Sequence, residues 1–216
     1  MPDAWLQQSR SSTARRASIS IKLGRQRADY SAGLLPNAAM TEPTRYTRTA
    51  VALHWLLALA IVGTFILGVY MHELPESASR DRLYDWHRSA GASILALSAF
   101  RLLWRLTHRP PADIAMPAWQ TRAAHIVHGL LYVLFFAVPL SGWAHSSAGG
   151  HSVLLFGALP LPDFVPVGKG LAGTLKELHE VFGVLLGLLV IGHVAAAVKH
   201  HWLDRDGLLA RMAWRG

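Results

Sequence analysis

The chain has 216 residues, of which 52% are hydrophobic and only 16% are charged, and its formal net charge is +8. This composition is too apolar for an ordinary soluble domain. The absence of cysteine excludes disulfides, thiolate zinc sites, iron–sulfur clusters and covalently attached c-type haem. The basic residues lie between and beyond the apolar runs, as membrane topology would place them, so the positive charge does not indicate nucleic-acid binding.

Residues 1–44 are polar, rich in arginine and serine, and show no sustained hydrophobic periodicity. They lack the apolar core of a secretory signal, and their composition is similar to that of a transit peptide. A second interpretation, which we favour, is that translation starts at Met40 and that the preceding residues are a start-site artefact. In both cases we expect this segment to be disordered and the folded domain to comprise residues 45–212.

Four apolar stretches are each near the length of about 20 residues that an α-helix needs to cross a bilayer. They cover residues 50–70, 86–103, 123–143 and 178–198. The second stretch is the weakest, because Arg88 and Arg101 lie at its ends, where both side chains can reach the membrane surfaces. The sequence therefore predicts an all-α fold, an integral membrane four-helix bundle.

Lysine and arginine residues in the connections predict the orientation of this bundle. They gather before the first stretch, in the 104–122 connection and in the C-terminal tail. In the first loop, by contrast, Arg80 and Arg82 are diluted by carboxylates, and the long 144–177 loop carries only Lys169 and Lys176. Both termini are therefore predicted to be cytoplasmic, with the 144–177 loop on the outer side.

Four histidines receive a depth from this topology. His179 and His193 are 14 residues apart, close to four turns, so both project from one face of the last helix. His87 matches the depth of His179 near the outer side, and His54 matches His193 near the cytoplasmic side. Haem b needs two axial imidazoles on opposite faces of a flat macrocycle, and facing helices of a bundle can supply them. For each histidine taken alone, a hydrogen-bonding role in helix packing is the alternative.

The residue four positions after each of these histidines is small, which leaves space for a macrocycle against the helix. These residues are Ala58, Gly91, Gly183 and Ala197. Small residues are frequent in membrane helices, so the pattern adds modest support. His125 and His128 have no partner left at their depth, and we expect them to be interfacial or to bind a haem propionate.

Several motifs lie along the predicted domain: ALHW (52–55), HRSAG (87–91), RLLWR (101–105), HGLLYVLFFAVPLSGW (128–143), LHEVFG (178–183) and HVAAAVKHHWLDRDGLLARM (193–212). Together they resemble the prokaryotic cytochrome b561 family of four-helix, di-haem membrane proteins. The family's haem ligands fall on His54, His87, His179 and His193, the four residues chosen above.

The resemblance implies electron transfer across the bacterial inner membrane, through two b haems, between a donor at the outer surface and quinone. One branch of the family looks like a superoxide oxidase, which oxidises superoxide and reduces ubiquinone. A set of cations could attract such a small anion, and the alternative for each is an ordinary loop charge: Arg80, Arg82, Arg88, Lys169 and Lys176. Arg88 could instead bind a haem propionate.

His200 falls on a family position that is linked to quinone, and histidine titrates in the range needed to supply protons. The alternative is an interfacial histidine that anchors the helix end. Two other functions stay open. One is a haem-bearing membrane subunit that links quinone to a separate dehydrogenase or hydrogenase, and the other is a transporter or anchor whose histidines only pack. The expected partners are the lipid bilayer, the quinone pool and a small anionic donor, with a homo-oligomer or docking redox protein as further options.

Overall fold

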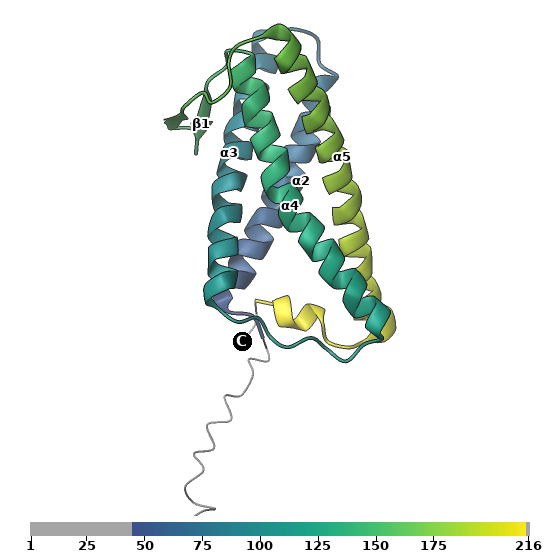
Figure 1. Ribbon diagram of the computed structural model, residues 1–216. Coiled ribbons are helices and arrows are strands. Elements are labelled where there is room, and N and C mark those ends of the chain that lie inside the picture. Colours follow the sequence, from purple (N-terminus) through teal and green to yellow (C-terminus); the bar gives the residue numbers. More distant parts are fainter. Residues whose placement is uncertain (1–44, 215–216) are drawn as a thin grey trace, which may run out of the picture. The chain divides into compact units, whose positions relative to one another are not determined.

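The computed structural model describes residues 45–214, in which four long helices follow one another (Figure 1). The predicted disorder of residues 1–44 lies outside the described residues. In chain order the elements are α2 (Arg48–His72), α3 (Ala78–Thr107), α4 (Ala118–Ala148), the strands β1 (Val153–Leu155) and β2 (Leu159–Leu161), α5 (Lys169–Lys199), the π-helical turn η1 (His200–Asp204) and the 3₁₀ turn η2 (Leu209–Met212).

Polar caps set where the first two helices begin. The Thr47 hydroxyl accepts a hydrogen bond from the Ala50 N–H at 3.2 Å, and the Ser77 hydroxyl accepts one from the Arg80 N–H at 3.3 Å. Such side-chain oxygens satisfy N–H groups that the first turn of a helix leaves unpaired. In α3, Asp81 adds a negative charge in the first turn, where it interacts favourably with the helix dipole.

Three helical segments of the described chain are long and apolar enough to cross a membrane: Arg48–His72, Ala118–Ala148 and Lys169–Asp204. Large apolar side chains on these helices point away from the protein, as Leu59 and Val133 do with 73% and 63% of their surface exposed. Exposed apolar surface on this scale is typical of a helix that faces lipid. The predicted 86–103 stretch lies within α3, but α3 is not among the three segments, so its passage through the bilayer stays a prediction.

The 144–177 segment is more ordered than the loop that the sequence predicts. α4 continues to Ala148 and α5 begins at Lys169. Between them β1 and β2 form an antiparallel hairpin in which Val153 lies opposite Leu161. A half-buried strand is recognised in a sequence by alternating apolar and polar residues. The hairpin is a continuous apolar run, so this signal is missing.

The centre of the bundle is an apolar core between α4 and α5. Leu131, Leu134 and Leu186 are buried together there. Nearby, Gly187 of α5 lets α2 come close, because a Cβ atom at this position would lie 3.2 Å from the Phe65 ring. This core separates two ends of the bundle. The His87 end contains the C-terminal end of α2 and the N-terminal end of α3, and the His54 end contains their opposite ends.

Substituting Gly187 should test the contact between α5 and α2. We expect Gly187→Leu to lower the midpoint of thermal unfolding in detergent, because overpacking a close contact costs about 1–3 kcal/mol. Gly192→Leu in the same helix is the matched control, since nothing lies within 4 Å of a Cβ atom built there. Equal unfolding midpoints for the two variants would contradict the close packing of Phe65.

Candidate functional site: two pairs of facing imidazoles

The structure brings the four histidines together in the two pairs that the sequence predicts. The ring centroids of His87 and His179 are 6.0 Å apart, and those of His54 and His193 are 6.2 Å apart. His54 lies in α2 and His87 in α3, whereas α5 contributes one histidine to each pair. One helix therefore joins both sites. Their assignment as metal ligands stays a prediction at this point.

The separation of the rings matches two axial ligands of one metal. A metal–imidazole bond of about 2 Å on each side, with about 1 Å from the bound nitrogen to the ring centre, places two such ring centres roughly 6 Å apart. Two imidazoles in direct contact through a hydrogen bond do not explain either pair, since none joins them among the described residues. The spacing therefore leaves room for an atom between the rings of each pair.

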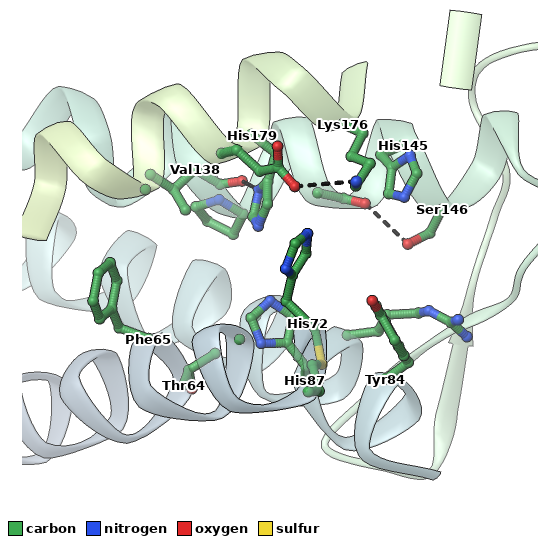
Figure 2. A pocket seen from close by; sticks show the side chains of 18 of the residues that line it. Thr64, Phe65, His72, Tyr84, His87, Val138, His145, Ser146, Lys176 and His179 are labelled. Atoms are coloured by element: carbon green, nitrogen blue, oxygen red, sulfur yellow. Dashed lines mark hydrogen bonds and ion pairs between the residues drawn. The ribbon is translucent and has the colours of Figure 1, made fainter. Parts of the chain in front are cut away.

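A cavity of about 1020 Å³ surrounds the pair at the His87 end. Figure 2 shows His87 and His179 entering it from opposite sides, with Tyr84 and Lys176 towards one end of it. All four long helices contribute to its wall, and Phe65 and Leu134 form part of its apolar lining. A cavity of this size and character suits a large, mostly apolar cofactor.

The imidazole of His179 is held in the orientation that a metal ligand needs. Its Nδ1–H donates a hydrogen bond to the carbonyl oxygen of Val138 at 2.9 Å. This bond fixes the proton on Nδ1 and leaves Nε2 free to bind a metal, as is usual for ligating histidines. Across the cavity, His87 Nδ1 is buried with no hydrogen-bond partner among the described residues.

Two glycines allow the backbone to approach these imidazoles. A Cβ atom at Gly142 would lie 2.9 Å from Cε1 of His179, and one at Gly68 would lie 3.0 Å from Cε1 of His87. Sequence reasoning missed both residues, because each lies on a helix that faces the ligand and not on the ligand's own helix. Gly91 and Gly183, which the sequence did single out, line the cavity with open space where their Cβ atoms would be.

The His54 end carries a third imidazole. The ring of His128 lies 5.5 Å from that of His193, so the residue that the sequence left without a partner joins this pair. Arg101 Nη2 lies 3.3 Å from His54 Nδ1, and its Nη1 donates to the Ala50 carbonyl oxygen at 3.2 Å. A guanidinium can only donate, so the contact puts the proton of His54 on Nε2. Metal binding through Nε2 requires Arg101 to leave Nδ1.

Three of the five cations predicted to attract an anion line the cavity at the His87 end, namely Arg80, Arg88 and Lys176. Arg82 and Lys169 are not part of its lining.

Each cation in the wall is balanced by a neighbouring carboxylate. Arg88 donates to Asp85 at 2.8 Å, Lys176 lies 3.3 Å from Glu180, and Arg80 lies 3.9 Å from Glu76. The local field is therefore weaker than the count of cations suggests.

His200 begins a turn that sequence reasoning did not foresee. The π-helical residues of η1 and the left-handed conformation of Arg205, at φ 51°, turn the chain back. The turn brings Asp206 Oδ2 to 2.6 Å from His200 Nδ1 and Asp204 Oδ2 to 3.1 Å from it. Lys199 balances part of this charge, since its Nζ lies 2.5 Å from Asp204.

Asp206 is fixed at both oxygens. Its Oδ1 accepts the Leu208 N–H at 3.0 Å, and its Oδ2 accepts the Nδ1–H of His200. Partial burial would raise the pKa of Asp206, but the hydrogen bonds from Leu208 and His200 outweigh burial, so this pKa lies below its usual range. The carboxylate is therefore ionised at neutral pH and holds the His200 ring with Nε2 free.

Paired imidazoles from facing helices of a membrane bundle define the class of b-type cytochromes. The chain belongs to one family within that class: the sequence model described as prokaryotic cytochrome b561 matches residues 45–215. It is therefore a bacterial membrane oxidoreductase that transfers electrons, and the family implies haem b. The His87 end suits that cofactor in its ring spacing, in its cavity and in the open space at Gly91 and Gly183.

Curated relatives support this membership along most of their length. The chain is 33% identical over 175 residues to cytochrome b561 homolog 2 of Escherichia coli strain K12, covering 79% of this chain and 92% of the relative. It is 30% identical over 170 residues to cytochrome b561 homolog 1 of the same strain, covering 78% and 96%. It is also 30% identical over 169 residues to a Yersinia pestis protein named "Probable superoxide oxidase CybB", covering 78% and 95%.

Filling the space at Gly142 should remove haem from the His87 end. In Gly142→Val the new side chain would displace the His179 ring, because even its Cβ atom would lie within 3 Å of that ring. We expect a lower ratio of haem to protein, measured from the absorbance of the purified variant. Gly129→Val, in the same helix and with open space around its Cβ position, should keep the wild-type ratio. An unchanged ratio in Gly142→Val would show that this glycine does not position His179.

Proposed function

We propose that the chain binds two b haems and conducts electrons across the bacterial inner membrane from superoxide to ubiquinone. The observation that carries the proposal is that two imidazole pairs lie at opposite ends of the bundle and that α5 contributes one histidine to each of them. His87 and His179 would hold one haem, and His54 and His193 the other. When bound, each haem supplies an iron that gains and loses one electron at a time.

The residues around each site would orient the imidazoles and bind the cofactor. The Val138 carbonyl holds His179 in the tautomer that ligates through Nε2. Apolar side chains of the cavity, such as Phe65 and Leu134, exclude water from the site. At the His54 end, Arg101 would exchange the His54 nitrogen for an anionic group of the cofactor, which a guanidinium binds more strongly than a neutral ring.

The orientation of the bundle in the membrane is inferred from the distribution of lysine and arginine. With both termini in the cytoplasm, the His87 end faces the outer side of the inner membrane and the His54 end faces the cytoplasm. A donor such as superoxide would then react near the cavity, where Arg80, Arg88 and Lys176 lie. Overall, two superoxide ions lose one electron each to give two molecules of oxygen, and ubiquinone gains two electrons and two protons.

The His200–Asp206 pair is suited to supply those protons. The carboxylate keeps a proton on Nδ1 and stabilises the imidazolium that forms when Nε2 takes up a proton from the cytoplasm. Nε2 can then donate to a quinone oxygen and be protonated again. The charged groups that face His200 are Asp204 and Asp206, with Lys199 bound to Asp204, and no other ion pair of the described residues reaches it.

A two-stage experiment tests the proposed activity. The purified protein should show the absorbance of reducible b-type haem, and superoxide generated by xanthine oxidase should reduce that haem and then added ubiquinone. The control is the self-dismutation of superoxide without the protein. Haem that is reduced by quinol but not by superoxide would instead support a membrane subunit of a separate dehydrogenase or hydrogenase, and the absence of haem would support a transporter or anchor.

Replacing Asp206 tests the proton pathway. In Asp206→Asn the imidazolium loses its stabilising charge, so we expect quinone reduction to slow by about tenfold to a hundredfold. This is less than the roughly 10²–10⁴-fold contribution of a general acid, because His200 itself remains. Haem reduction by superoxide should stay unchanged.

Asp113→Asn is the matched control, because Asp113 pairs with His125 at 3.1 Å and makes no contact with His200. This variant should keep the wild-type rate of quinone reduction. A wild-type rate in Asp206→Asn as well would exclude Asp206 from proton delivery while leaving electron transfer through the haems untouched.

A further inference from the structure

The hairpin of β1 and β2 is apolar from end to end. Residues 153–162 contain no charged and no hydrogen-bonding side chain. Three of its side chains point away from the protein, with exposed fractions of 64% for Phe156, 59% for Leu159 and 39% for Leu154. Nothing in the described chain covers them. In an aqueous loop such a run would be an exposed apolar patch of the kind that marks an interaction surface.

β1 packs against α3, and Figure 1 shows the hairpin beside the upper part of that helix. The Phe156 N–H donates a hydrogen bond to the Ser93 hydroxyl at 3.1 Å. Ser93 lies six residues beyond His87 in α3, and therefore about 9 Å deeper along the helix axis. The turn of the hairpin thus lies deeper in the bundle than His87.

The N–H groups of the turn are satisfied without water. Besides the bond from Phe156 to Ser93, the Ala158 N–H donates to the Leu155 carbonyl at 3.1 Å and the Gly157 N–H to the Leu154 carbonyl at 3.4 Å. All three N–H groups of the turn therefore have protein acceptors. Unpaired N–H groups are costly in hydrocarbon and tolerable in water, so this arrangement suits a lipid environment.

The free edge of β2 also lacks N–H donors. Pro160 lies opposite Leu154 and has no N–H, so its nitrogen points away from β1. Residues two apart in a strand share the same side, so Pro162 continues that edge. The opposite strand, β1, faces α3, and its Val153 is 2% exposed. Proline on an outward edge removes the groups that would otherwise be unpaired there.

We propose that the hairpin is a re-entrant element that inserts into the membrane leaflet at the His87 end and contacts lipid acyl chains. The proposal rests on the proposed membrane-spanning bundle. The hairpin would cover part of α3, which is the least apolar of the four helices and presents Ser89 and Ser93 there. The Ser93 hydroxyl donates to the Ser89 carbonyl at 2.8 Å while accepting from the Phe156 N–H, so this hydroxyl is satisfied within the protein.

Spin labels on single cysteines can measure the depth of the hairpin, because the chain has no cysteine of its own. Leu159→Cys and Phe156→Cys would carry a nitroxide in the full chain reconstituted in phosphatidylcholine vesicles. Power saturation then compares collisions with oxygen, which concentrates in hydrocarbon, and with a water-soluble nickel chelate. We expect both hairpin labels to favour oxygen at least several-fold over the chelate.

Two reference labels separate the possible failures. Val133→Cys, on the exposed face of α4, reports the spanning bundle, and Asp163→Cys, just after the hairpin, reports water. Hairpin labels that match Asp163 while Val133 favours oxygen would overturn the hairpin proposal and leave the bundle intact. A Val133 label that favours the chelate would overturn the spanning bundle itself. Dipolar broadening of the Leu159 signal that disappears on dilution with unlabelled protein would identify a second copy as the occupant and overturn the lipid proposal.

Discussion

The hydrogen bond between His179 and the Val138 carbonyl is the interaction on which the rest of the site depends. A buried imidazole has two nitrogens, and one must be satisfied by the protein before the other is free for a metal. The bond at 2.9 Å does this, and it requires α4 to lie against α5 so closely that only glycine fits at Gly142. The packing of α4 against α5 therefore determines that Nε2 of His179 is the nitrogen left free.

The two ends of the bundle differ in how far their existing contacts suit a haem. At the His87 end the rings, their spacing and the surrounding cavity already suit a macrocycle. At the His54 end Arg101 contacts the nitrogen that must carry the proton, and His128 adds a third ring beside His193. A haem at the proposed His54 site would require these polar contacts to rearrange, whereas a haem at the proposed His87 site would enter an existing cavity. Binding at the His54 end would therefore involve the larger reorganisation.

The sequence predicts the outline of this molecule well because its strongest signals are local or periodic. Long apolar runs indicate three of the helices, and the 14-residue interval in α5 indicates that two histidines share a face. The depth of the other two histidines follows from the same runs, and the structure brings them to the expected partners.

What the sequence does not predict depends on the approach of segments distant in the chain. Gly68 and Gly142 matter only because a facing helix brings an imidazole to them. Asp206 reaches His200 only because Arg205 takes a left-handed conformation that reverses the chain. The sequence predicts a loop where the hairpin lies, because a short apolar run without alternation does not distinguish a strand from other buried structure. The position of the hairpin beside Ser93 is a tertiary contact.

The contact between Gly187 and Phe65 has a mechanical consequence for the shared helix. Gly187 lies eight residues after His179 and six before His193, so α2 touches α5 near the midpoint between the two imidazoles. A rigid helix that tilts about such a fulcrum moves its two ends in opposite directions. Any displacement of His179 towards His87 would then swing His193 away from His54, so the two imidazole pairs would be geometrically coupled through α5.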